Sequence, residues 1–296
     1  MPAWPTAVGI GLDAVLGDPR RGHPVAAFGT VAAGAERLGY KDSRAAGAVY
    51  AAGLTASAVG LGVLLSRRRW LAAVATWAVV GGTTLRREAR TMHVLLDRGD
   101  LDGARARLPH LCGRDPSQLD VPGLARATVE SVAENTSDAV VAPLFWGAIA
   151  GVPGLLGYRA VNTLDAMVGH RSARYERFGW AAARLDDVAN WVPARLTALL
   201  AVALAPVVDG RPAAALRAWR RDGHKHPSPN AGPVEAAFAG ALGRTLGGRL
   251  TYGERVEERA LMGDGPGPLV ADIPRAARLS AAVSLTAGAL AVAARR

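Results

Sequence analysis

Three acidic residues at helical spacing are the first candidates for chemistry. Residues 128–138 read TVESVAENTSD, so Glu130, Glu134 and Asp138 stand at positions i, i+4 and i+8. On one helix this spacing places three carboxylates along a single stripe. No lysine interrupts the stripe, and the segment continues into the apolar run AVVAPLFWGAIAG. A carboxylate stripe that leads into an apolar helix indicates a site at a membrane edge, where bound cations offset the charges.

Four further stretches combine acids, cations and amides that could complete such a site. For each stretch, capping of a turn or a solvated surface is the alternative interpretation. The proline-rich stretch near the start is also suited to a rigid phosphate or metal loop. The HKHPSPN loop is expected to bind substrate only if it folds over the acidic residues. The four groups are Asp13, Asp18, Arg20 and His23; Asn162, Asp165, His170 and Arg171; Arg184, Asp186, Asp187 and Asn190; and Arg220, Asp222, His224, Lys225, His226, Ser228 and Asn230.

The ligand types favour magnesium and phosphate chemistry. The acids and amides offer hard oxygen atoms, whereas the single cysteine, Cys112, excludes a multi-cysteine zinc site. Mg²⁺ is usually held by one or two carboxylates together with phosphate oxygens of the substrate. The sequence has no Walker A loop, GxGxxG, GxSxG or HExxH motif. These features together predict a membrane enzyme that handles a polyphosphate.

Composition places these residues in a membrane protein. Half of the 296 residues are hydrophobic and 20% are charged, and the mean hydropathy is +0.14. The formal net charge of +10 suits nucleic acid, anionic lipid or a polyanionic substrate. Nucleic acid is the weakest of these, because the arginines are scattered between apolar runs. We therefore expect the lipid bilayer as a partner and no nucleic acid.

The elements that position the candidate residues are predicted to be helices throughout. Residues 45–66 carry no charge and are long enough to span a bilayer core of roughly 30 Å. Residues 67–69 should turn this span into a second apolar run, 70–85, and residues 139–168 should form a re-entrant hairpin that turns at Pro153-Gly154. Other expected elements are a paired-helix polar cap at 86–127 with a break at 99–100, a short membrane-inserted or interfacial segment at the start, an apolar run at 192–208, and helices at 213–221, 235–248 and 276–294.

We thus expect an all-α, polytopic integral membrane bundle with about four to six membrane segments, one of them the re-entrant hairpin, and helical polar loops. Residues 1–296 should form one membrane-embedded catalytic domain with the polar cap at about 86–127. No internal repeat and no strand-like alternation is found.

Six motifs together resemble one family across nearly the whole chain. They are GDPRRGHPV, LCGRDP, ATVESVAENTSDAVVAPLFW, VNTLDAMVGHR, ARLDDVANWVPARL and HPSPNAG followed by EAAFAGALG. In this order they resemble the CobD/CbiB family of cobalamin biosynthesis, the adenosylcobinamide-phosphate synthases. The resemblance implies an ATP-dependent ligase that joins adenosylcobyric acid to (R)-1-aminopropan-2-ol O-phosphate, or to aminopropanol, giving adenosylcobinamide phosphate.

The resemblance transfers no catalytic residue, so we assign roles from chemistry. ATP would convert the corrinoid carboxylate to an acyl phosphate, which the amine then attacks, and phosphoryl transfer needs Mg²⁺ and cationic clamps. An acceptor ammonium must also lose a proton to a base. The predicted catalytic residues are Glu130, Glu134, Asp187 and His23; the metal ligands Glu130, Glu134, Asp138, Asp186 and Asp187; and the substrate- or phosphate-binding residues Arg20, Arg114, Asn135, Arg171, Lys225, Ser228 and Asn230.

Two other functions are kept as alternatives. One is a membrane Mg²⁺-dependent prenyl or alcohol-phosphate transferase, and the other is a non-enzymatic corrinoid or metal transport component. The resemblance implies a multi-pass protein of the bacterial plasma membrane with its active face in the cytoplasm, where ATP and the corrinoid intermediates are. A homo-oligomer, or a complex with other cobalamin-assembly membrane proteins, is the expected form of any protein partnership.

Overall fold

The computed structural model describes residues 3–19, 22–170, 172–252 and 255–295, with only the backbone of 249–252 and 255–257. The chain folds into two compact units that are interleaved in sequence. The first unit comprises residues 1–81, 138–191 and 287–296, and the second comprises 82–137 and 192–286. The single catalytic domain expected from the sequence stays a prediction.

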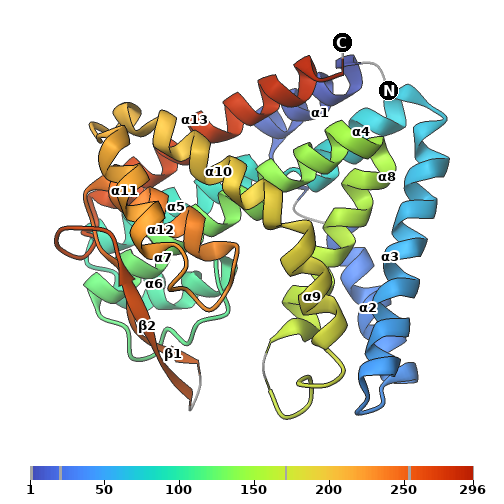
Figure 1. The fold of residues 1–296 in the computed structure, drawn as a ribbon, viewed down its shortest axis with the longest axis horizontal. Coiled ribbons are helices and arrows are strands. Elements are labelled where there is room, and N and C mark those ends of the chain that lie inside the picture. The colour runs from blue at the N-terminus through green and yellow to red at the C-terminus, as the bar shows by residue number, and fades with distance from the viewer. Residues whose placement is uncertain (1–2, 20–21, 171, 253–254, 296) are drawn as a thin grey trace. The chain divides into compact units, whose positions relative to one another are not determined.

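In the first unit, α2, α4, α8 and α9 contact α3, and α1 packs against α4 (Figure 1). Phe178 is its buried aromatic centre, with the rings of Tyr40 and Tyr50 at 5.2 and 5.0 Å, and small residues such as Ala32 and Ala51 let the helices approach closely around it. The elements are α1 (Ala3–Leu16), α2 (Pro24–Gly39), α3 (Arg44–Ser66), α4 (Arg69–Val79), the π-helix η2 (Ser137–Val141, from residue 138), α8 (Ala142–Leu164), the π-helix η3 (Asp165–Gly169) and α9 (Trp180–Ala189).

The hairpin predicted within residues 139–168 is present in α8, and its re-entry into the membrane stays a prediction. Asn162 Nδ2 lies 3.3 Å from Asp138 Oδ2, whereas a straight helix would separate residues 24 apart by about 36 Å. The chain turns back at Gly151 (φ 71°, ψ −152°), two residues before the expected Pro153-Gly154. Only glycine adopts such backbone angles without strain, and Pro153 then suits the first turn of the returning arm because it needs no N–H donor there.

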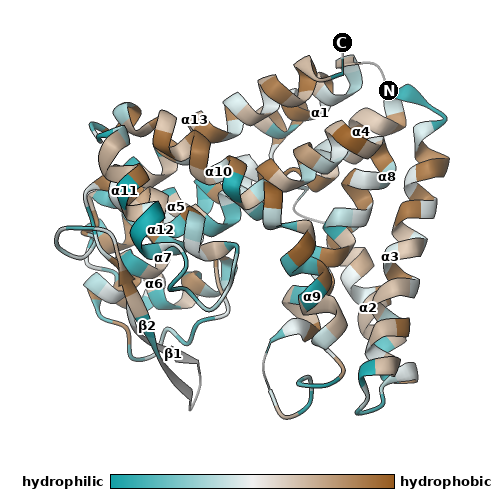
Figure 2. Cartoon of the chain, in the orientation of Figure 1, coloured by the Kyte–Doolittle hydropathy of each residue, from teal (hydrophilic) through white to brown (hydrophobic). Residues whose placement is uncertain are grey.

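Helices of membrane length confirm the predicted fold class. Among the described residues, three helical stretches are long and apolar enough to cross a membrane: Arg44–Ser66, Val121–Gly169 and Asp272–Ala293. The shorter apolar helices are Ala3–Leu16 and Trp191–Ala203. Only 17% of the apolar window of α3 is buried within the protein, and its exposed residues include Val49 and Leu64. The apolar colouring along α3 is visible in Figure 2.

The second unit surrounds α12, whose twelve residues are all buried. A side chain at Gly240 would collide with the backbone of α11, so the small residues of α12 permit this close approach. The predicted break at 99–100 is confirmed, because α5 ends at Asp97 and Asp100 caps the next helix. The elements are α5 (Gly82–Asp97), α6 (Leu101–Arg107), η1 (Leu108–His110), α7 (Val121–Thr136), α10 (Trp191–Ala203, from residue 192), η4 (Ala205–Val208), α11 (Pro212–Asp222), α12 (Ala231–Leu242), β1 (Leu246–Tyr252), β2 (Arg255–Met262) and most of α13 (Asp272–Ala293).

A two-stranded antiparallel hairpin corrects the expectation that no strand is present. β1 pairs with β2, and the register shifts between Leu246 and Gly248. The helix predicted over 235–248 ends at Leu242 because Gly243 adopts the left-handed conformation (φ 67°) that caps helices. Gly247 and Gly248 also have positive φ, which fits a bulge in the strand. β1 therefore lacks the apolar alternation by which a strand is recognised, and β2 has three polar residues in succession.

Candidate functional site

The first unit contains a cluster of oxygen-rich side chains around Asn162. Its amide nitrogen lies 3.3 Å from Asp138 Oδ2 and 3.4 Å from Asp186 Oδ1. Asn190 donates to the other oxygen of Asp186 at 3.0 Å, and Tyr158 donates to Asn190 Oδ1 at 2.8 Å. We call these five residues the aspartate cluster. Neutral amide and phenol groups hold its two carboxylates in place.

Three elements of the first unit build the aspartate cluster. Asp138 lies on the π-helix η2, Tyr158 and Asn162 lie on the returning arm of α8, and Asp186 and Asn190 lie at the end of α9. π-Helical turns recur at functional sites because they re-aim a side chain within a helix. Asp138 and Asp186 are half-buried, whereas Tyr158 and Asn190 are buried. The carboxylates therefore remain reachable while their supports are fixed.

The loop that precedes α2 approaches the same π-helix. Trp77 donates its indole N–H to Gly17 O at 2.9 Å, and the Gly81 N–H donates to Ala139 O at 3.0 Å. A Cβ atom at Gly81 would be 3.6 Å from Asp18 Oδ2, so Asp18 lies next to the turn that carries Asp138.

Both ring nitrogens of His23 make contacts at this loop. Nδ1 accepts from the Val25 N–H at 3.1 Å and caps α2. The other nitrogen, Nε2, lies 3.9 Å from Asp18 Oδ1. Because Nδ1 is an acceptor, Nε2 carries the proton and faces the carboxylate. Arg20 and Arg171, the phosphate-binding residues predicted nearby in sequence, lie outside the described residues.

Asp187 is separated from its neighbour Asp186 by the direction of its side chain. Asp187 Oδ2 is 2.8 Å from Arg184 Nη1, and that arginine is 61% exposed. The pair is an i, i+3 ion pair on the helix surface. The structure therefore joins Asp138 with Asp186 and leaves Asp187 in a surface pair.

Glu130 and Glu134 belong to a different cluster, in the second unit. Glu130 is buried; its Oε2 lies 2.7 Å from Arg114 Nη1, and its Oε1 accepts from the Gly247 N–H at 2.7 Å. Glu134 is exposed and interacts electrostatically with Arg259, Arg114 and Glu130. Arg114, predicted to clamp phosphate, is thus a buried ion-pair partner. We call Glu130, Glu134, Glu235, Arg114, Arg259 and His226 the glutamate cluster.

His226 is held neutral within the glutamate cluster. Arg259 Nη1 lies 2.9 Å from His226 Nε2, and because arginine only donates, this nitrogen must accept. Burial, and then the charge of Arg259, lowers the pKa of His226 to about 4. Its neighbour Glu235 is 3.7 Å away, and burial raises the pKa of that carboxyl well above its ordinary value, with Glu130 and Glu134 adding to the effect.

The remaining predicted substrate-binding residues take part in local structure. Lys225 lies 2.8 Å from Asp222 Oδ1, and the hydrogen bond from Arg221 holds the pKa of Asp222 below its ordinary range. Ser228 Oγ accepts from the backbone at the start of α12. Asn230 Oδ1 accepts from Arg195 at 3.1 Å, and Asn135 donates to Ser131 O at 2.8 Å. These contacts do not test substrate binding, which stays a prediction.

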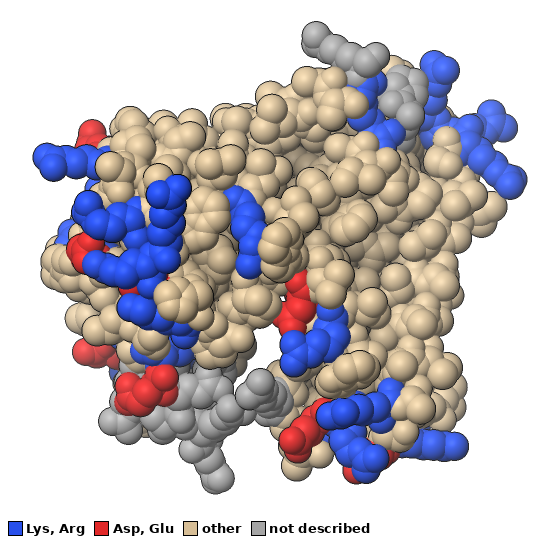
Figure 3. All heavy atoms as spheres, viewed as in Figure 1, with Lys and Arg blue, Asp and Glu red and all other residues tan. Residues whose placement is uncertain are grey.

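Basic side chains also gather over α11 in the second unit (Figure 3). Arg217, Arg220 and Arg221 are exposed there. Asp264 offsets part of this charge, because Arg217 Nε is 3.7 Å and Arg221 Nη1 2.7 Å from its carboxylate.

The five predicted metal ligands are divided between the two units. Glu130 and Glu134 face arginines, which disfavour a dication, whereas Asp138 and Asp186 share amide donors. Within the described part of the chain, no group of three or more His, Cys, Asp or Glu side chains is arranged to hold a metal ion. Two carboxylates completed by substrate phosphate are nevertheless sufficient for Mg²⁺.

Sequence reasoning missed several members of both clusters. Tyr158 lies in an apolar run and looks like a core aromatic, and Arg259 lies in the strand that was not predicted. Glu235 offered a usable signal, because it is the only charged residue in the otherwise apolar segment AGPVEAAFAGAL. A lone carboxylate in a fully buried helix indicates either an ion-pair partner or a functional role.

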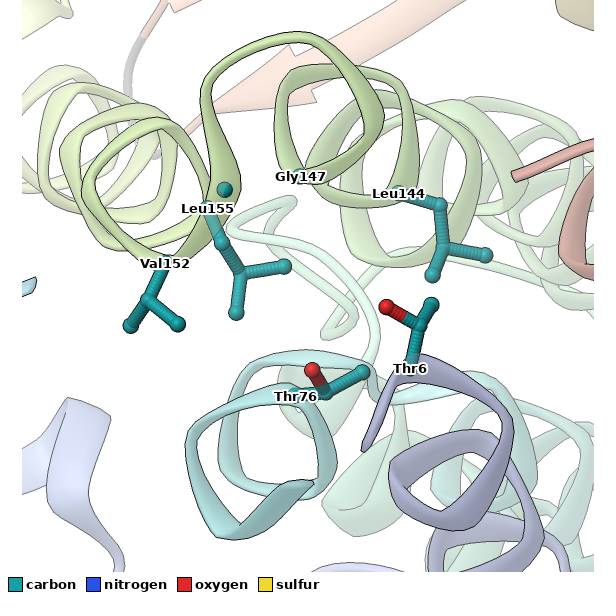
Figure 4. Close-up of a pocket in the computed structure, with 7 residues that line it drawn as sticks. Thr6, Thr76, Leu144, Gly147, Val152 and Leu155 are labelled. Atoms are coloured by element: carbon teal, nitrogen blue, oxygen red, sulfur yellow. The ribbon is translucent and has the colours of Figure 1, made fainter. Parts of the chain in front are cut away.

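A small cavity lies beside the turn of the α8 hairpin. Figure 4 shows Thr6 and Thr76 facing Leu144 and Leu155 across it. Its free volume of about 10 Å³ is at the lower limit for a single water molecule. Arg295 donates to Gly147 O nearby, so the turn is tied to the end of α13. The cavity is too small for a substrate.

The membrane-length helices and the half-buried aspartates define an all-α protein with membrane-spanning segments and an oxygen-rich polar site. The chain belongs to the CobD/Cbib family, whose model, described as CobD/Cbib protein, matches residues 6–280. It is 58% identical to the cobalamin biosynthesis protein CobD of Mycobacterium tuberculosis, over 96% of this chain and 93% of that protein.

Two further relatives carry the same name. The cobalamin biosynthesis protein CobD of Rhodobacter capsulatus is 43% identical, over 96% of each chain. That of Stutzerimonas stutzeri is 46% identical, over 90% of this chain and 88% of the relative. No solved structure matches this chain.

Proposed function

We propose that this protein is an enzyme of cobalamin biosynthesis: a membrane ligase that uses ATP to join the carboxylate of adenosylcobyric acid to aminopropanol phosphate or aminopropanol. Membership of the CobD/Cbib family and the names of its relatives support the pathway. The observation that carries the chemistry is the pair Asp138 and Asp186, joined through Asn162 in a half-buried setting.

Asp138 and Asp186 are the residues that would hold Mg²⁺. Their carboxylate oxygens, with amide and phenol groups around them, are the hard donors that Mg²⁺ prefers. When bound, the ion would offset the negative charge of the nucleotide phosphates. Asn162, Asn190 and Tyr158 orient the two carboxylates, and such supporting contacts strongly affect metal affinity.

The remaining chemistry concerns the two reacting groups. A carboxylate is a poor acyl donor, so transfer of the ATP γ-phosphoryl group to it gives an acyl phosphate, and attack by the amine releases phosphate. Arg159 lies beside the aspartate cluster, with Nη1 3.4 Å from Asn162 Oδ1, and offers positive charge for phosphate oxygens. The amine must lose a proton before it attacks, and an acidic side chain with an ionised form at neutral pH can accept it.

The proposed reaction is tested with purified protein. Adenosylcobyric acid, aminopropanol phosphate and Mg-ATP are supplied, and the product is identified by mass spectrometry. We expect an amide product that requires all three substrates. Transfer to a polyprenyl diphosphate would instead favour the transferase, and corrinoid flux across proteoliposomes without chemical change would favour transport.

The variants D186N and D187N test which aspartate matters. The geometry predicts that D186N abolishes most turnover, because Asp186 shares Asn162 with Asp138, and that D187N loses far less. A larger loss in D187N would move the metal proposal to the surface pair. D42N is the control, since Asp42 is exposed and 3.6 Å from Arg177.

We further propose that the protein resides in the bacterial plasma membrane with its polar face in the cytoplasm, where ATP is available. Single-cysteine labelling tests this topology. Because α8 folds back at Gly151, positions just before residue 142 and just after residue 164 should be labelled from the same side.

A further inference from the structure

Glu235 is a buried carboxylate that the proposed chemistry does not use. It lies on the fully buried helix α12, and its residue exposure is 1%. Its Oε2 atom has no hydrogen-bond partner among the described residues. A buried ionised carboxylate without partners is strongly disfavoured, so it is either neutralised by a proton or matched by a cation.

His226, which contacts Glu235, does not supply the missing positive charge. His226 Nε2 is 3.7 Å from Glu235 Oε1, but the same nitrogen accepts from Arg259 at 2.9 Å. The ring is therefore neutral and presents no N–H to Glu235 at this nitrogen. His226 packs against the carboxylate without offsetting its charge.

Among the described side chains, the charges that act on Glu235 leave the glutamate cluster one positive charge short. Arg114 pairs with Glu130 at 2.7 Å, and Arg259 is the second cation. If Glu235 were ionised, three carboxylates would oppose two guanidinium groups. In the part of the chain whose side chains are described, the titratable groups that act on Glu235 or contact it are Glu130 and Glu134 of α7, Arg114 of the preceding loop, Arg259 of β2 and His226 of the loop before α12.

Glu134 makes the glutamate cluster accessible to solvent. It is exposed, one turn along α7 from the buried Glu130, and it acts electrostatically on Glu235. One further positive charge satisfies the cluster, whereas a dication would exceed it beside Arg114 and Arg259. A primary ammonium carries a single charge and three N–H donors, which suit carboxylate oxygens.

We propose that Glu134 binds the ammonium group of a small amine and that the buried Glu235 holds a proton which is released to solvent as the ammonium binds. The charge of the cluster is unchanged by this exchange: the carboxylic acid of Glu235 becomes a carboxylate as one cation arrives. The choice of a small amino-alcohol as ligand rests on the proposed function, whose acceptor substrate is such an amine.

The exchange is measured by titration calorimetry of the purified full-length protein with 1-aminopropan-2-ol at pH 7, in two buffers of different ionisation enthalpy. The wild-type protein should release a proton to the buffer on binding. E235Q mimics the protonated form, so it should bind the amine more weakly than the wild-type protein and without proton release. E134Q should bind at least tenfold more weakly.

Matched controls separate this site from general charge effects. Propane-1,2-diol lacks the ammonium and should not bind, and E258Q removes a carboxylate that is exposed on β2 and should behave as wild type. Unchanged proton release in E235Q, or unchanged affinity in E134Q, would overturn the proposal.

A wild-type measurement guards against a variant that fails to fold. Because the proton on Glu235 competes with the ammonium, affinity for the amine should rise as the pH is raised from 5 to 8, and a flat profile would contradict the proposal. Proton-linked amine binding without amide product would refute the proposed function alone. Amide formation with binding unaffected in E134Q and E235Q would refute this inference alone.

Discussion

The aspartate cluster and the glutamate cluster use the same chemical group in opposite settings. Asp138 and Asp186 are half-buried and held by neutral amides, whereas Glu130 is buried against Arg114 and a backbone N–H. A carboxylate that a guanidinium already neutralises has little attraction left for a metal ion, while one oriented by amides keeps its charge. The partners of an acid, more than the acid itself, decide its role.

The largest effect should come from Asp186. D186N removes one of two carboxylates from the aspartate cluster, and loss of such a ligand or its support should lower turnover by about 100-fold. Steady-state turnover as a function of Mg²⁺ concentration measures this, and thermal unfolding should change little. If E130Q lost as much turnover while folding normally, the distinction between the two clusters would fail.

The next largest effect concerns stability in the glutamate cluster. R114M leaves the buried carboxylate of Glu130 without its ion-pair partner, which should cost about 3–5 kcal/mol in the free energy of unfolding. Thermal unfolding in detergent compares it with R184M, which breaks an exposed pair and should cost at most about 1 kcal/mol. If R114M had the same melting temperature as the wild-type protein but a different Mg²⁺ requirement, the result would indicate that Glu130 is a metal ligand.

A smaller effect is expected when a supporting contact of the aspartate cluster is removed. Y158F removes the hydroxyl that donates to Asn190 Oδ1 at 2.8 Å, and with it the chain that orients Asp186. We expect a loss of about 1 kcal/mol in stability and a several-fold rise in the Mg²⁺ concentration needed for half-maximal turnover. An unchanged Mg²⁺ dependence would show that Tyr158 is only a packing residue.

The smallest effect is a difference in pH dependence. The pKa of Glu235 is raised in the folded state, so its stabilising contribution is complete below the ordinary value of 4.5 and is lost as the pH rises toward the folded pKa. E235Q lacks this loss and should gain stability relative to wild type as the pH increases from 4.5. His226, with its folded pKa lowered to about 4, acts oppositely between pH 6.5 and 4. Because its ring is 3.7 Å from Glu235, the two proteins are compared above pH 6.5, where the ring is neutral in both the folded and the unfolded state.

Regular helices and their breaks could be predicted from sequence because the signals are local. The uncharged run at 45–66, the break at 99–100 and the hairpin within 139–168 all follow from composition, glycine and proline. The turn was misplaced by two residues, since Gly151 and Gly154 look alike in sequence, and only the backbone angles distinguish them. β1 was missed because two glycines interrupt its pattern, and β2 was missed because its polar residues stand in succession instead of alternating with apolar ones.

The candidate site was predicted in part, because which acids lie together depends on contacts between distant segments. The i, i+4 spacing grouped Glu134 with Asp138, yet the π-helix that begins at Ser137 redirects the stripe between them. Asp186 and Asp187 are adjacent in sequence, and nothing local shows that only Asp186 reaches Asn162. Long-range partners such as Arg259 and Tyr158 carry no sequence signal of their own.

The glycine contacts between α3 and the α8 hairpin bear on how the protein enters the bilayer. A side chain at Gly62 would collide with the backbone of Pro153, and one at Gly157 would meet Val59, so the returning arm is shaped to fit a helix made earlier in the chain. A pair of short arms broken by glycine and proline is a weak signal for the insertion machinery. Synthesis from the N-terminus delivers α3 first, and this order provides the hairpin with a protein surface to fold against during biogenesis.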